Sequence, residues 1–69
     1  MIDSLIICIL QCNYKNGMTT QDILDELRLA KPLIYFEYHN ISNRCIRLAH
    51  NDVIISTRNK HDAIIYKIT

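Results

Sequence analysis

The chain has one glycine, one proline and no tryptophan among its 69 residues. Because glycine and proline mark most turns and loops, their scarcity predicts that nearly all of the chain lies in regular secondary structure. A single glycine, Gly17, also excludes the glycine-rich loops with which many proteins bind phosphate. A chain of this length forms one domain with a small core.

The cysteines are odd in number, which excludes a complete disulfide framework. Cys8, Cys12 and Cys45 lie beside isoleucine and leucine on predicted helices, so we interpret them as small buried residues in a reducing compartment. Cys8 and Cys12, four residues apart, offer two zinc ligands, but the scattered histidines supply no second pair. We therefore expect no metal and no cofactor.

Neither sign of charge dominates, because the formal net charge is only +1. This excludes binding to nucleic acid through bulk charge alone, although most of the basic side chains lie from Lys31 onward. No side chains show the spacing of a catalytic set, and we expect neither enzyme activity nor a small-molecule ligand. The apolar run from Leu5 to Leu10 is too short to span a bilayer and lacks the flanks of a signal peptide. These features predict a cytoplasmic protein without a membrane partner.

The first predicted helix covers residues 3 to 15 and is more apolar than one buried face requires. Its surplus apolar surface predicts either a homodimer contact or simple burial under the rest of the chain, and we favour the dimer. The residues assigned to this interface are Leu5, Ile7, Cys8 and Cys12. Asn16 and Gly17 offer a left-handed end to the helix.

The second predicted helix begins at Thr19 or Thr20. With Thr19 as N-cap, Asp22 takes the third helical position, which is a variant of the capping box. Pro32 ends this helix because it disfavours helical geometry at the preceding residue, and it suits the first turn of the next helix.

The third predicted helix occupies residues 34 to 50. Its apolar side chains follow the 4-3-4-3 spacing of an amphipathic helix. They are Ile34, Tyr38, Ile41, Cys45 and Leu48. Two runs rich in β-branched residues, 53–57 and 63–68, then predict a β-hairpin with a loop at 58–62. Three helices followed by two strands predict an α+β fold.

This order of elements resembles the winged helix-turn-helix family of DNA-binding proteins. The stretches that carry the resemblance are MTTQDILDEL at 18–27, ISNRCIRLAHNDVI at 41–54 and IYKIT at 65–69. The resemblance implies a single winged-helix domain over 1–69, with helix 34–50 in the major groove of double-stranded DNA and hairpin 53–68 as the wing. It also implies a small transcriptional regulator, similar to those of viruses and mobile elements.

Two features depart from the family pattern. Asn51 and Asp52 replace the glycine that usually follows the recognition helix, and we expect Asn51 to adopt the left-handed conformation there. The segment between Leu27 and Cys45 is also longer than in compact members. The third helix is therefore either extended at its start or preceded by an insertion.

The polar side of the third helix carries residue types that read DNA bases. Arg44 and Arg47 lie three residues apart and share a helix face, and arginine binds guanine or phosphate. Asn40 and Asn43 lie on the same face, and asparagine suits adenine. The alternative interpretation is a solvated polar face, such as every amphipathic helix has.

Two further places offer candidate DNA contacts. Arg58, Lys60 and His61 lie in the hairpin loop and either touch the minor groove and flanking phosphates or are solvated turn residues. Thr20 and Gln21, at the start of the second helix, offer donors to a phosphate, although capping alone explains the threonine.

The rival interpretation is a winged helix that docks on a partner protein, which a small net charge and an isoleucine-rich first helix also fit. A basic stripe joining Arg44, Arg47 and the wing favours DNA, whereas a broad apolar patch there favours a protein. Tyr35 and Phe36, just before this face, are assigned to the core; the alternative is packing on the sugar-phosphate backbone.

Overall fold

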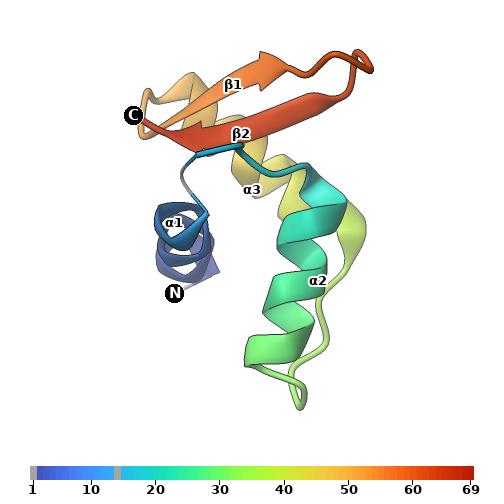
Figure 1. Ribbon diagram of the computed structural model, residues 1–69. Coiled ribbons are helices and arrows are strands. Elements are labelled where there is room, and N and C mark those ends of the chain that lie inside the picture. The colour runs from blue at the N-terminus through green and yellow to red at the C-terminus, as the bar shows by residue number, and fades with distance from the viewer. Residues whose placement is uncertain (1, 14) are drawn as a thin grey trace.

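The computed structural model describes residues 2–13 and 15–69, and it contains three helices followed by an antiparallel β-hairpin (Figure 1). The elements are α1 (Ile2–Cys12), α2 (Thr20–Ala30), α3 (Tyr38–His50), β1 (Ile54–Arg58) and β2 (Ile64–Ile68). This α+β arrangement has the topology of a winged helix, as predicted. None of the helices in the described part of the chain is long and apolar enough to cross a membrane.

Helix α1 ends at Cys12, earlier than the predicted residue 15, and residue 14 lies outside the described residues. Asn13 explains the early end, because its side-chain Nδ2 donates a hydrogen bond of 2.9 Å to the carbonyl of Ile9. A side-chain donor of this kind satisfies a carbonyl that the helix itself leaves open. Ile6 and Leu10 anchor α1 in the core, where both are fully buried.

The chain between α1 and α2 makes a contact with the hairpin that the sequence analysis did not predict. Met18 pairs with Tyr66 of β2 as an isolated antiparallel bridge, with N–O distances of 2.9 and 2.8 Å in the two directions. Gly17 enters this bridge with a φ of +72°. It therefore shapes the approach to β2 and does not end α1.

Replacing Gly17 with alanine is expected to lower the free energy of unfolding by roughly 1–3 kcal/mol, because a side chain is disfavoured at positive φ. A Cβ atom at this position would also lie 2.7 Å from Cγ of Lys67 and 3.1 Å from the carbonyl oxygen of Tyr66. Urea unfolding of the variant, beside the neighbouring exposed substitution Asn16→Ala, measures the effect. Equal unfolding midpoints for Gly17→Ala and the parent would contradict this close approach.

Helix α2 begins with the predicted capping box, which the structure confirms. The backbone N–H of Asp22 donates to Oγ1 of Thr19 at 3.1 Å, and the N–H of Thr19 donates back to Oδ2 of Asp22 at 3.2 Å. Ile23, Leu24 and Leu27 then face the core. The helix ends before Pro32, as expected.

The segment from Lys31 to Glu37 is an irregular linker, so the prediction that the third helix begins at residue 34 is wrong. Phe36 supplies the physical reason. In a continuous helix it would share a face with Asn43, seven residues later, and would point away from the core. Instead Phe36 is buried, with 3% of its surface exposed. The burial of Phe36 therefore requires a break in the helix before Tyr38. Of the two expected alternatives, an extended third helix or an insertion before it, the structure has the insertion.

The linker exposes the apolar side chains on either side of this anchor. Leu33 is fully exposed and Tyr35 is 83% exposed, while Ile34 is about half exposed. The assignment of Phe36 to the core is thus confirmed, and that of Tyr35 is wrong. Alternate residues of an extended segment point in opposite directions, so one anchored ring turns its neighbour outward.

Helix α3 packs on the core through Ile41, Cys45 and Leu48, as the periodicity predicts. The assignment of Ile34 and Tyr38 to the same buried stripe is wrong, because both are exposed at the start of the helix or before it. It ends in a Schellman motif, in which the N–H of Val53 donates to the carbonyl of Leu48 and that of Asp52 to the carbonyl of Ala49. The left-handed residue of this motif is Asp52, with a φ of +61°. The expectation that Asn51 takes this conformation is wrong by one position.

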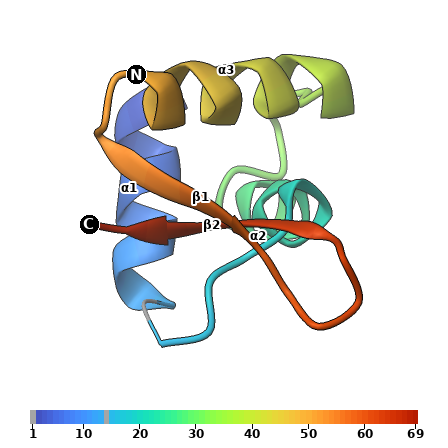
Figure 2. The ribbon, with the colours of Figure 1, turned by 90° about the horizontal axis from the view of Figure 1, so that it is seen from above.

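The hairpin follows with Ile54 opposite Ile68 and Arg58 opposite Ile64. Both strands begin one residue later than predicted, and the loop covers residues 59 to 63. Seen from above, α3 runs along one side of the molecule, the hairpin crosses over α2, and the loop projects away from α3 (Figure 2). Ile54 and Tyr66 bury the underside of the hairpin.

Candidate nucleic-acid interface

The outer face of α3 lacks carboxylates and is mostly polar, with Ile46 as an exposed apolar side chain among the polar ones. Ile41, Cys45 and Leu48 define its core side, and no aspartate or glutamate occurs from Tyr38 to His50. The exposed polar side chains of the helix are His39, Asn40, Asn43, Arg47 and His50. The sequence prediction placed Asn40, Asn43 and Arg47 on this face, and the structure brings these three together there.

Arg44 is turned toward α1 and does not belong to the free part of this face. Its Nη1 lies 3.2 Å from Oδ1 of Asp3, and its side chain is only partly exposed. Its Nε is buried and has no partner among the described residues. An ion pair this exposed contributes little to stability. Arg44 thus lies at the edge of the outer face beside Asp3, and its contact with DNA stays a prediction.

Sequence reasoning missed His39 and His50 on the same face. His39, Asn43 and His50 follow one another at spacings of four and seven, which place all three on one side of a helix. The same periodicity that identified the arginines would have found them. The sequence analysis weighs the histidines only as metal ligands. In the structure His39 packs edge-to-face against the neighbouring ring of Tyr38, with ring centroids 6.0 Å apart.

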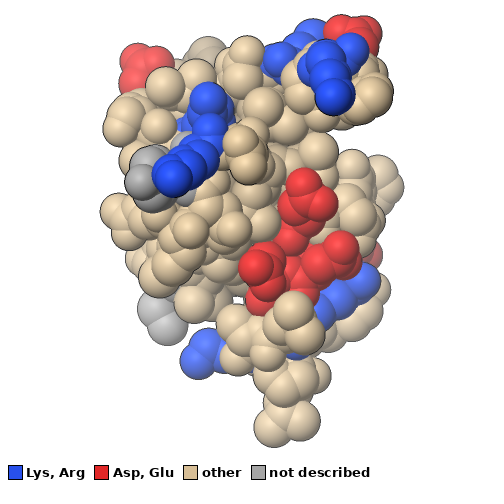
Figure 3. Space-filling view, in the orientation of Figure 1, with Lys and Arg blue, Asp and Glu red and all other residues tan. Residues whose placement is uncertain are grey.

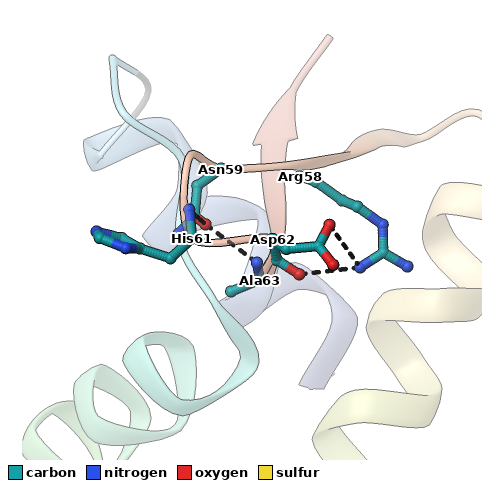
Figure 4. A network of polar contacts seen from close by, with 5 residues as sticks. All are labelled: Arg58, Asn59, His61, Asp62 and Ala63. Atoms are coloured by element: carbon teal, nitrogen blue, oxygen red, sulfur yellow. Dashed lines mark hydrogen bonds and ion pairs between the residues drawn. The ribbon is translucent and has the colours of Figure 1, made fainter.

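The hairpin loop is held by its own side chains (Figure 4). Nη1 of Arg58 donates to the carbonyl of Asp62 at 2.9 Å and lies 3.6 Å from its carboxylate. Oδ1 of Asn59 accepts hydrogen bonds from the N–H groups of His61 and Ala63. Arg58 is thus bonded within the loop while it stays exposed, and its contact with DNA stays a prediction.

Lys60 and His61 are both exposed in this loop, as predicted, and their contacts with DNA stay a prediction. In Figure 4 the side chain of His61 extends from the opposite side of the loop to that of Arg58. In Figure 2 the loop projects away from α3. Arg44 and Arg58 are each paired with an aspartate, whereas Arg47 and Lys60 form no ion pair among the described residues.

The start of α2 does not offer the phosphate contacts that were predicted. Thr20 is buried, which removes its hydroxyl from the surface. Gln21 is exposed, but its Nε2 donates to Oδ1 of Asp25 at 2.9 Å. Carboxylates gather over α2 in Figure 3, where Asp22, Asp25 and Glu26 line one groove. Negative charge at this place repels a phosphate.

Beneath α3, Cys45 and Tyr66 form a buried titratable pair. Burial, followed by the nearby negative charge of Asp3, raises the pKa of the Cys45 thiol from 9.0 to about 11. Burial is also the main cause that raises the pKa of Tyr66, with a smaller contribution from Cys45. The burial of Cys45 is confirmed, whereas Cys8 and Cys12 are exposed and their predicted burial is wrong.

This shift predicts a loss of stability at high pH. A thiol whose pKa is higher in the folded state keeps its full contribution below about pH 9, and the contribution is lost as pH rises toward 11. We expect Cys45→Ala to be less stable than the parent at pH 7, but to lose less stability between pH 9 and 11. Urea unfolding of both proteins under reducing conditions measures the two slopes, and parallel slopes would contradict a neutral buried thiol.

No family model, curated protein or solved structure matches this chain. Across the described part of the chain, histidine, cysteine and carboxylate side chains form no group of three that could hold a metal ion. Inferences about function therefore rest on the geometry and chemistry of the surfaces described above.

Proposed function

We propose that the protein binds double-stranded DNA through the outer face of α3 and acts as a small transcriptional regulator of the winged helix-turn-helix family. The observation that carries this proposal is the composition of that face. It exposes amide, guanidinium and imidazole groups around one apolar side chain, Ile46, without a carboxylate, while the acids gather on α2. A helix that presents donors and excludes negative charge is suited to the major groove.

Asn43 and Arg47 are the side chains best placed to read bases. Both are exposed, and they lie four residues apart on the same face. The asparagine amide matches the donor and acceptor pattern of adenine, and the guanidinium matches guanine or a phosphate. Arg44 lies at the edge of the same face, where it pairs with Asp3 of α1.

The loop supplies a second and separate contact. Lys60 is exposed and forms no ion pair among the described residues, so its ammonium group is available to a phosphate. Because the loop projects away from α3, we assign it to the sugar-phosphate backbone outside the groove that α3 enters. Such a contact adds affinity for any sequence.

Selection of duplexes from a randomised pool, followed by fluorescence anisotropy at several salt concentrations, tests the proposal. With Arg47 and Lys60 as the cations that meet phosphate, the plot of log affinity against log salt should have a slope of about −2 per protomer. Lys60→Ala should make this slope shallower. Lys15→Ala removes the same charge at an exposed position between α1 and α2, outside the proposed interface, and should leave the slope unchanged. Failure to enrich any duplex would contradict DNA binding.

The second candidate function is binding to a partner protein. One observation favours it, at a surface other than the outer face of α3. Large apolar side chains are exposed around the end of α2 and the linker, including Leu29 and Leu33. This region lies at the opposite end of the molecule from the hairpin (Figure 1). The apolar patch thus leaves the outer face of α3 free, and the two candidates do not compete for one surface.

A further inference from the structure

Helix α1 carries an apolar stripe that the core does not cover. Ile6 and Leu10 point into the core, whereas Leu5 is only partly buried and Cys8 and Cys12 are exposed. The spacing of three and four residues places Leu5, Cys8 and Cys12 on one side of the helix. Ile7 points roughly 160° away from Leu5 at 3.6 residues per turn, so it does not belong with these three.

Two apolar grooves lie along this stripe, one at each end of α1. The first is bounded by Leu5 together with Ile34 and Phe36 of the linker. The second is bounded by Cys8 and Cys12 together with Leu29 of α2. Both grooves thus have α1 as one wall and the end of α2 or the linker as the other.

The two grooves carry opposite charges. Among the described residues that line them, Lys31 is the charged one in the first groove and Glu26 is the charged one in the second. The basic groove lies at the start of α1 and the acidic groove at its end. A second α1 placed antiparallel would therefore bring Lys31 of one chain toward Glu26 of the other at both ends.

We propose that these grooves are occupied by a second copy of the chain, which packs its α1 antiparallel against the first. In a two-fold arrangement the same patch serves both copies, so a stripe flanked by charges of opposite sign complements itself. The axis passes near Cys8, the middle of the stripe, and Leu5 of each copy enters the second groove of the other. This surface refines the predicted dimer interface by removing Ile7, and it does not depend on DNA binding.

Analytical ultracentrifugation without DNA tests the assembly. The parent chain is expected to be a dimer, and Cys8→Glu should raise its dissociation constant by about tenfold or more, because two like charges would meet at the axis. Cys8 is exposed, so this change leaves the fold intact, as circular dichroism can verify. Gln11→Glu, on the same helix but in neither groove, is the matched control and should leave the constant unchanged.

A charge exchange tests the antiparallel direction. Lys31→Glu and Glu26→Lys should each weaken the dimer, and the double variant should restore it. A monomeric parent, or a Cys8→Glu variant that dimerises as tightly as the parent, would overturn the proposal. A double variant weaker than either single variant would overturn the antiparallel pairing.

Cross-linking with diamide gives a second measurement. Diamide is a diazene that oxidises thiols. The Cys8 thiols of the two chains together lose two protons and two electrons, which reduce diamide to its hydrazine, and a disulfide forms between the chains. Since the axis lies near Cys8, Cys12→Ser should still cross-link and Cys8→Ser should not. The reverse pattern would place the axis elsewhere and contradict the proposed packing. Neither ultracentrifugation nor cross-linking uses DNA. A failure of the proposed dimer can therefore be told apart from a failure of the proposed DNA binding.

Discussion

Replacing Phe36 with alanine is expected to remove roughly 3–5 kcal/mol of unfolding free energy. The ring is almost fully buried, and it is the residue through which the linker from Lys31 to Glu37 reaches the core. A small domain has a total stability of the same order, so a large fraction of this variant should be unfolded at 25 °C. Urea unfolding followed by far-UV circular dichroism measures the change.

Tyr35 provides a control of nearly the same size in the adjacent position. Its ring is mostly exposed, so Tyr35→Ala should change the unfolding free energy by no more than about 0.5 kcal/mol. If the two variants lost similar stability, Phe36 would not be the anchor of the linker. The burial of Phe36 would then not explain why α3 begins only at Tyr38.

Reversing the charge of Arg47 is expected to weaken specific DNA binding by about a hundredfold or more. Loss of a guanidinium contact costs roughly 1–3 kcal/mol, and the new carboxylate adds repulsion from the phosphates. Arg47 is exposed, so Arg47→Glu should leave the melting temperature nearly unchanged. Anisotropy titrations with the selected duplex measure the loss.

Arg28→Glu is the matched control, because it makes the same change of net charge at an exposed position on α2. It should weaken binding far less than Arg47→Glu if α3 is the reading element. Equal losses in the two variants would mean that only the overall charge matters. Unchanged binding in Arg47→Glu would remove α3 from the interface.

Local patterns in the sequence were enough to predict the elements that rest on local physics. The capping box needs only Thr19 and Asp22, three residues apart. The core side of α3 follows from the helical repeat of Ile41, Cys45 and Leu48. The strands follow from β-branched runs, and these features together give the winged-helix topology.

The features that the sequence did not reveal depend on contacts between distant residues. Arg44 meets Asp3 across 41 positions of the chain, and Met18 meets Tyr66 through backbone groups that leave no side-chain pattern. Pro32 is compatible both with the start of a helix and with a break, and only the burial of Phe36 decides between them.

The candidate site shows the same division. Periodicity identified the polar face of α3, yet it did not indicate that one of its arginines is held by α1. The helical repeat also predicts the core stripe of α1, and its members are buried or packed against the core: Ile2, Leu5, Ile6, Ile9 and Leu10. The burial of Cys8 and Cys12 was predicted from their apolar character alone, and both lie outside that stripe and are exposed.

Amide chemical-shift mapping of the isotope-labelled protein, titrated with its selected duplex, tests the central claim most directly. We expect the largest changes on the outer face of α3, at His39, Asn43, Arg47 and His50, with a second group at Lys60 in the loop. Changes confined to α1 and the linker, or no changes with any duplex, would contradict recognition of DNA by α3.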